Sequence, residues 1–191
     1  MSRISSQHKA VLAAVASLVA LASSATPALA SSDRAAPSNT SQAKSAGLTQ
    51  AQALVLQRKV DSYLERTAQG HQTGPNTIAF PGGQITVAVP GERYARDLRT
   101  THAPLEAMNC NYGNFCATVD GDPTQKDYFY CGTYGIGYSG SGAWINNQTQ
   151  SRRVRMNLTN GRTYTTPNAF YQDPTADWTP VYQLTTCIPK S

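Results

Sequence analysis

The four cysteines of this chain follow an amino-terminal segment that is typical of exported proteins, and together these features constrain the fold most. Residues 1–30 combine a short basic start, an apolar run over residues 10–22 and the cleavage motif Ala28-Leu29-Ala30, which is the layout of a secretory signal peptide. The sequence therefore predicts a secreted, extracellular protein whose mature chain begins at Ser31. In an oxidising medium, an even number of cysteines in a small domain indicates disulfides. The residues concerned are Cys110, Cys116, Cys131 and Cys187.

Two disulfides are expected, and the local pattern favours one pairing. The turn sequence at residues 120–123 predicts a hairpin in which Cys116 lies opposite Cys131. Cys110 is then left for Cys187, although four cysteines also allow two other pairings. A metal site is not expected, because the chain has no C-x-x-C pair.

The amino-terminal half divides into a leader and a helical segment. Residues 31–47 contain little that could be buried and are predicted to be a disordered leader. Thr49 and Gln52 then have the spacing of a capping box. The apolar stripe of the following helix comprises Ala53, Leu56, Val60, Tyr63 and Leu64, and Gly70 is the expected end of the helix.

Strand signals follow the helix. Residues 77–80 and 84–89 flank a Pro-Gly-Gly turn and predict a hairpin. Further along, residues 115–119 and 128–131 are expected to be the two strands around the turn at 120–123. Asn160-Gly161 predicts a two-residue turn that pairs Leu158 with Thr163, so that one face carries Arg153, Arg155, Arg162 and Tyr164.

These patterns predict a mainly β protein, α+β overall, in several parts. Residues 48–98 would be a helix and hairpin subdomain that is either retained or removed as a pro-region, residues 99–109 a connector, and residues 110–191 a small disulfide-bonded β domain.

Three stretches of the carboxy-terminal part resemble a known family. They are Cys110-Asn-Tyr-Gly-Asn-Phe-Cys116, Trp144-Ile-Asn-Asn-Gln-Thr149 and Asp177-Trp-Thr-Pro-Val-Tyr182. They are similar to secreted actinobacterial proteins of the βγ-crystallin-like peptidase inhibitor family typified by the Streptomyces metalloproteinase inhibitor. The resemblance implies a compact Greek-key β domain and binding rather than catalysis. The chain departs from the crystallin motifs at Gln125, where an aromatic residue is expected, and at Gln150 in the calcium signature.

No cofactor, metal or catalytic residue is expected. The segment Gly135-Ile-Gly137-Tyr-Ser-Gly140 matches the dinucleotide fingerprint in its letters, but no helix is predicted after it to bind a pyrophosphate. His71 and His102 lie apart from any nucleophile motif. A net charge of +5 without a dense basic cluster does not indicate nucleic-acid binding, and no apolar run is long enough to span a membrane.

Two binding functions are therefore weighed, ahead of an enzyme of unrecognised type. In the first, a rigid loop occludes an extracellular protease; the candidate loops are residues 120–126, with Asp122 and Pro123, and residues 135–142, with Gly137 and Tyr138. In the second, the face formed by Arg153, Arg155, Arg162 and Tyr164 binds a cell-wall polysaccharide or another component of the cell envelope. Trp144 and Trp178 are either core residues or binding platforms.

Overall fold

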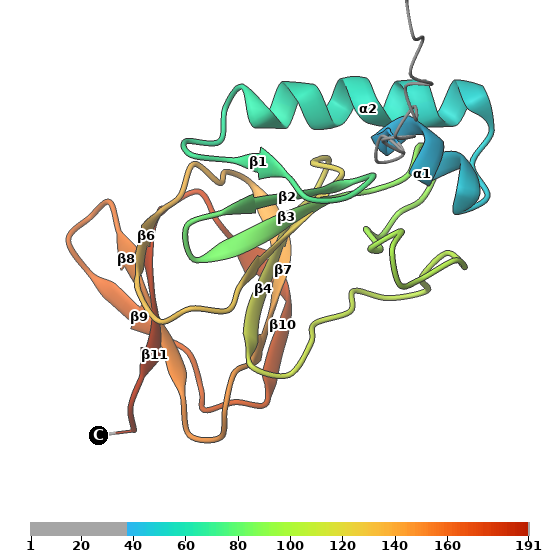
Figure 1. Ribbon diagram of the computed structural model, residues 1–191. Helices are drawn as coiled ribbons and strands as arrows, with labels where there is room; N and C mark the ends of the chain where they lie inside the picture. The colour runs from blue at the N-terminus through green and yellow to red at the C-terminus, as the bar shows by residue number, and fades with distance from the viewer. Residues whose placement is uncertain (1–37, 191) are drawn as a thin grey trace, which may run out of the picture. The chain divides into compact units, whose positions relative to one another are not determined.

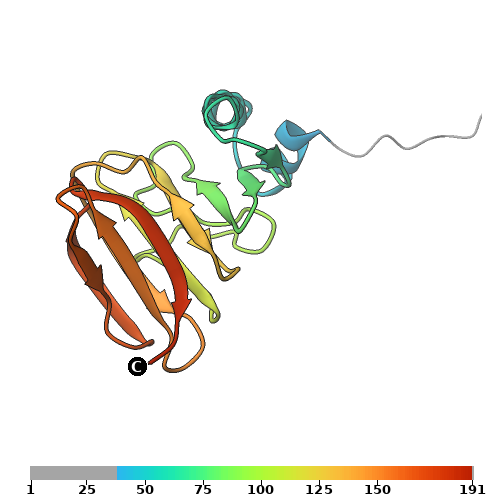
Figure 2. The same cartoon turned by 90° about the vertical axis from the view of Figure 1, so that its left-hand side faces the viewer.

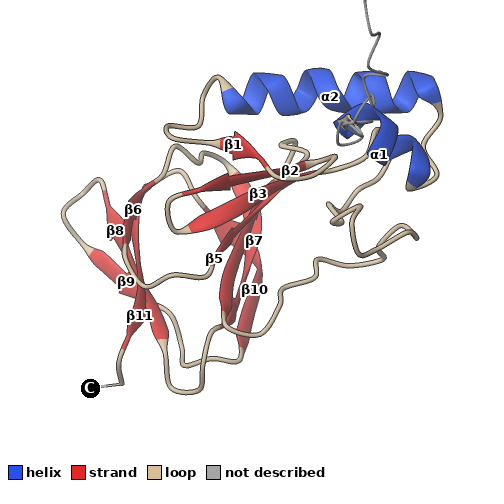
Figure 3. Ribbon diagram, in the orientation of Figure 1, coloured by secondary structure: helices blue, strands red, loops and turns tan. Residues whose placement is uncertain are grey.

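The computed structural model describes residues 38–190, so the expected signal peptide, its cleavage site and residues 31–37 of the expected leader lie outside the described residues. Within this range the protein is mainly β, with two antiparallel sheets and two helices (Figures 1 and 3). The larger sheet has the spatial order β1 (His71–Gln72), β2 (Thr77–Phe80), β3 (Gly83–Val87), β5 (Thr124–Tyr128), β4 (Asn114–Val119), β7 (Ser141–Asn147), β10 (Tyr171–Asp177). The smaller sheet has the order β6 (Thr133–Gly135), β11 (Val181–Ile188), β8 (Arg153–Leu158), β9 (Thr163–Thr165).

The two helices pack on one end of the larger sheet. Helix α1 (Asn39–Ser45) precedes α2 (Gln50–Leu64), and α2 begins at the predicted capping box, with Gln52 N–H donating to Thr49 Oγ1 over 3.2 Å. Helix α2 lies along β2 and β3 (Figure 1), and Ala53, Leu56 and Val60 of its apolar stripe are buried in the first core. The buried side chains of this first core include Leu56, Val60, Ile78, Ile85, Val87 and Leu98.

A second core fills the space between the two sheets, which Figure 2 shows packed against each other. Its largest buried side chains are Phe115, Trp144, Trp178, Val154 and Leu184. Both tryptophans are therefore core residues, one of the two alternatives that the sequence left open.

Both cores lie on the same face of the larger sheet. Ile85 pairs with Lys126, Lys126 with Ala117, and Ala117 with Trp144. Directly paired residues project their side chains to the same side of a sheet. Helix α2 therefore covers the β2–β3 end of this face, and the smaller sheet covers the β4–β7 end.

The predicted leader is wrong where the structure describes it, and so is the predicted helix end. Residues 39–45 form α1, which begins at Ser38, whose side chain accepts the Ser41 N–H, and Ala43 is buried in the first core. Helix α2 ends at Leu64 rather than near Gly70. Thr67 Oγ1 donates to the Tyr63 carbonyl in the last turn, where the chain leaves the helix.

The predicted division into a helix and hairpin subdomain and a separate β domain does not match the structure. The predicted hairpin is present as β2 and β3, but β3 pairs with β5 along its whole length, from Gly83 with Tyr128 to Val87 with Thr124. One continuous sheet therefore crosses the expected boundary between residues 98 and 110.

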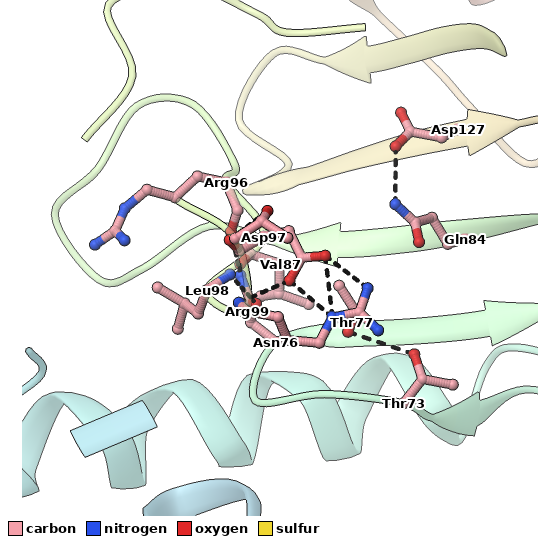
Figure 4. A network of polar contacts seen from close by, with 11 residues as sticks. Thr73, Asn76, Thr77, Gln84, Val87, Arg96, Asp97, Leu98, Arg99 and Asp127 are labelled. Atoms are coloured by element: carbon pink, nitrogen blue, oxygen red, sulfur yellow. Dashed lines mark hydrogen bonds and ion pairs between the residues drawn. The ribbon is translucent and has the colours of Figure 1, made fainter. Parts of the chain in front are cut away.

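The intervening segment is also attached to the sheet. Asn76, which is fully buried, donates to the carbonyls of Val87 and Arg96 and accepts the Leu98 N–H (Figure 4). A buried amide with all of these bonds fixes the turn before β2 to the chain that follows β3.

The described chain contains two disulfides, as expected, but their pairing differs from the prediction. Cys110 is bonded to Cys116, and Cys131 to Cys187. Strand β5 starts at Thr124, directly after the turn, and Cys116 therefore pairs with Asp127. Strand β5 ends at Tyr128, so Cys131 does not lie opposite Cys116. Cys131 instead precedes β6, where the register of β6 with β11 continues to the position opposite Cys187.

The hairpin at Asn160-Gly161 is present, but its register differs by one residue. Asn157 pairs with Thr163 and Met156 with Tyr164, because the connection has three residues and ends on Gly161 at a φ of 79°. This arrangement is typical of hairpins with a glycine bulge. A shift of one residue moves every side chain of β9 to the opposite face.

Candidate binding site

The two candidate loops, distant in sequence, lie side by side. The turn at residues 120–123 joins β4 to β5, and residues 135–142 lead from β6 into β7. The Asp120 N–H donates to the Ser141 carbonyl over 2.8 Å, and Val119 pairs with Gly142 where β4 meets β7. The structure therefore brings both predicted loops into one surface.

Asp122 fixes the turn to two different elements through three side chains. Its carboxylate accepts bonds from Lys126 Nζ at 2.7 Å and Thr124 Oγ1 at 2.8 Å, both on β5, and from the hydroxyl of Tyr63 on α2. Burial opposes ionisation of this carboxyl, but the bonds from Lys126 and Tyr63 outweigh it and lower its pKa. Burial and the adjacent carboxylate raise the pKa of Tyr63 to about 12. The ionised carboxylate of Asp122 therefore holds the turn in place through bonds within the protein, and it is not free to contact a partner.

Tyr138 anchors the second loop. Its ring and that of Trp178 form a T-shaped pair with centroids 5.2 Å apart, Lys126 Nζ lies 4.8 Å from the Tyr138 centroid, and the Tyr138 hydroxyl bonds to that of Tyr128. Burial, with the neighbouring Tyr128, raises its pKa well above the ordinary value. Tyr138 therefore points into the protein, whereas Gly137 is exposed.

Beside these loops lies a groove of about 800 Å³ between α2 and the smaller sheet. One wall is the end of α2, with Tyr63 and Arg66, and the other is formed by residues 133–139. Phe80, Ile85 and Tyr128 line it from the larger sheet. The groove follows from the arrangement of the two cores, because α2 and the smaller sheet cover separate parts of one face.

The predicted arginine face is present only in part. Arg155 and Arg162 are exposed, and Arg153 donates to the Pro189 carbonyl over 2.8 Å. Arg162 lies opposite Leu158, whose N–H donates to the Arg162 carbonyl, and so projects to the other side of the sheet from Arg155. Tyr164 is not on the predicted face either, because its pairing with Met156 turns it to the inner side. There it lines a cavity of about 220 Å³ together with Asp173.

The sequence reasoning missed two residues of this surface. Tyr63 was assigned only to the apolar stripe of α2, and Lys126 only to the end of a polar loop. Both are central to the Asp122 cluster. Spacing gave no signal for the ion pair of Asp122 with Lys126, because pairs four residues apart are favoured on helices and Lys126 lies on a strand. The contact of Asp122 with Tyr63 joins residues 59 positions apart.

Replacing Asp122 tests whether the turn depends on its ionised form. Asp122→Asn should lower the free energy of unfolding by about 1–3 kcal/mol at pH 7, because it removes a charge-assisted bond to Lys126. The native pKa of Asp122 lies below the ordinary pKa of an aspartate, so this stabilisation is fully present above the ordinary pKa and is lost as the pH falls through the lowered pKa. Urea unfolding of both proteins at several pH values measures the difference.

Asp120→Asn is the matched control in the same turn, because the Asp120 side chain bonds to none of the described residues. It should leave the free energy of unfolding nearly unchanged. An Asp122→Asn effect that stayed the same at pH 2.5 would contradict the role of the charge.

Comparisons with protein-family models, curated proteins and solved structures found no match to this chain. No helix within residues 38–190 is long and apolar enough to cross a membrane.

Proposed function

We propose that the protein is an extracellular binding protein of the peptidase-inhibitor type, and that its contact surface is formed by residues 120–123 and 135–142. The observation that carries this proposal is the meeting of the two predicted loops, joined by the bond from Asp120 to Ser141. An inhibitor that occludes a protease needs an exposed surface with one conformation, because a preorganised loop loses little entropy on docking.

The second loop is held at both ends and by its middle. The Ile136 N–H donates to the Tyr182 carbonyl over 2.9 Å, and the Gly140 carbonyl accepts the Trp178 N–H over 2.8 Å. Tyr138 anchors the segment between them. The exposed positions alternate with these anchors and include Gly135 and Gly137. The surface therefore offers main-chain groups that a protease can approach closely.

Two further features support the proposal. Two disulfides favour an oxidising, extracellular location. The stretches that resemble the actinobacterial inhibitor family lie in the described β region, and the resemblance attributes to it a crystallin-like Greek-key arrangement. Secretion through the segment at residues 1–30 is part of the same proposal. Carbohydrate binding by the arginine face is the alternative, but this face lacks the aromatic ring of Tyr164.

The test is inhibition of a panel of purified metallopeptidases and serine peptidases by the mature protein. Gly137→Glu should weaken inhibition by about tenfold or more, because a charged side chain would separate the docked main chains. The substitution is compatible with folding, since a Cβ at Gly137 meets no atom within 4 Å.

The double change Arg155→Ala and Arg162→Ala is the control for a general loss of surface charge, and it should inhibit like the wild type. Two results together would favour carbohydrate binding over the proposal. The protein would inhibit no peptidase of the panel, and it would bind cell-wall polysaccharide in a salt-sensitive way that the double change abolishes.

A further inference from the structure

Strand β6 has a free edge along the groove. The Ile136 N–H donates to Tyr182 and the Gly132 carbonyl accepts the Thr186 N–H, so the even-numbered residues bond to β11. In an antiparallel pair the intervening residues direct their N–H and C=O groups away from the partner strand. These are residues 133, 135 and 137, and no described residue bonds to their main-chain groups.

The groove has room for one more strand at this edge. Residues 133–139 line it along their whole length, and its volume is about 800 Å³. A strand added to β6 would lie about 4.8 Å from it, and seven extended residues span roughly 23 Å. The opposite wall is α2, so that the space accepts a single extended chain more readily than the rigid edge of another sheet.

We infer that this groove binds an extended polypeptide segment of a partner protein, which adds to β6 as an antiparallel or parallel strand. Main-chain groups in a row are best satisfied by another main chain, which is the basis of recognition by strand addition. The glycines at 135 and 137 leave the approach to these groups unobstructed, since a Cβ at either position would meet no atom within 4 Å.

The side chains of the groove define the chemistry of the segment. Phe80, Ile85 and Tyr128 offer an apolar floor for every second side chain of a bound strand. Asp122 and Lys126 already neutralise each other. Arg66 remains, with its guanidinium 4.5 Å from the centroid of the Tyr63 ring, and no carboxylate of the described chain pairs with it. The bound segment should therefore carry apolar residues on one face and an acidic residue opposite Arg66.

This inference goes beyond the proposed function, because it concerns the recessed edge of β6 and does not require the partner to be a protease. The probe is a phage-displayed library of random heptapeptides, selected on the mature protein. Enriched peptides should alternate apolar residues and share one acid. A synthetic peptide of the enriched sequence is then titrated by fluorescence polarisation against the wild type and three variants.

The variants separate the free edge from the rest of the groove. Gly135→Pro removes one N–H that faces the groove but none that bonds to β11, as prolines do on edge strands, and it should weaken binding by about tenfold or more. Gly135→Ala keeps the N–H and should bind within about twofold of the wild type. Arg66→Glu should remove the preference for an acid in a repeated selection.

A second measurement does not depend on any variant. In ¹⁵N-labelled wild-type protein, the amide protons of Gly135 and Gly137 should shift and become protected from exchange when the peptide binds. Three results would each overturn the inference. The selection could enrich no peptide, or Gly135→Pro could bind as well as the wild type while the amides stay unchanged. The chain could also form a dimer that Gly135→Pro dissociates. Inhibition of the peptidase panel by the wild-type protein reports on the proposed function separately.

Discussion

Deletion of residues 38–98 is expected to abolish cooperative folding of the remaining chain. These residues contribute α1, α2 and strands β1–β3, and β3 pairs with β5 at five positions. Their loss would turn β5, an interior strand of the larger sheet, into an unpaired edge strand, and long exposed edges favour aggregation. The deletion also removes Phe80, whose ring packs against Tyr128, and so exposes a residue of the second core. Circular dichroism and urea unfolding of residues 99–190 should show no single transition.

A shorter deletion is the matched control. Removing residues 38–47 takes away α1 and the buried Ala43 and Ala46 but keeps all strand pairing. This protein should still unfold cooperatively, at a lower urea concentration than the wild type. A stable, cooperatively unfolding fragment of residues 99–190 would instead support the view that residues 48–98 are a dispensable pro-region.

Features that depend on neighbouring residues could be predicted from the sequence. The capping box at Thr49 and Gln52, the apolar stripe of α2 and the β2–β3 hairpin each arise from interactions within a few positions. The Asn160-Gly161 hairpin was also recognised, but its register depended on whether the connection has two or three residues. That single difference moved Tyr164 and Arg162 to the opposite side from Arg155 and changed the predicted site.

Features that join distant segments could not be predicted. The pairing of β3 with β5 connects residues about 40 positions apart, and nothing in the alternation of either strand specifies its partner. The site shows the same limit. Asp122 and Gly137 were recognised as residues of exposed loops, but the bond between these loops and the contact of Asp122 with Tyr63 depend on the packing of α2 and of both sheets.

The two disulfides should contribute unequally to stability. Cys131 and Cys187 are separated by 56 positions, and Cys110 and Cys116 by six. In the chain-entropy description a closed loop of the first size stabilises the folded state by about 4 kcal/mol and one of the second size by about 2 kcal/mol. The long-range bond also joins the ends of β6 and β11, beside the edge that lines the groove.

The double change Cys131→Ser and Cys187→Ser should therefore lower the free energy of unfolding by about 4 kcal/mol, and the double change Cys110→Ser and Cys116→Ser by about half as much. Urea unfolding measures both effects, with the second protein as the control for loss of a disulfide as such. Peptide mapping without reduction should show these two pairs. A Cys116–Cys131 peptide, or equal losses in the two proteins, would contradict both the pairing and the argument from loop length. The larger loss arises because the Cys131–Cys187 bond restricts more of the unfolded chain.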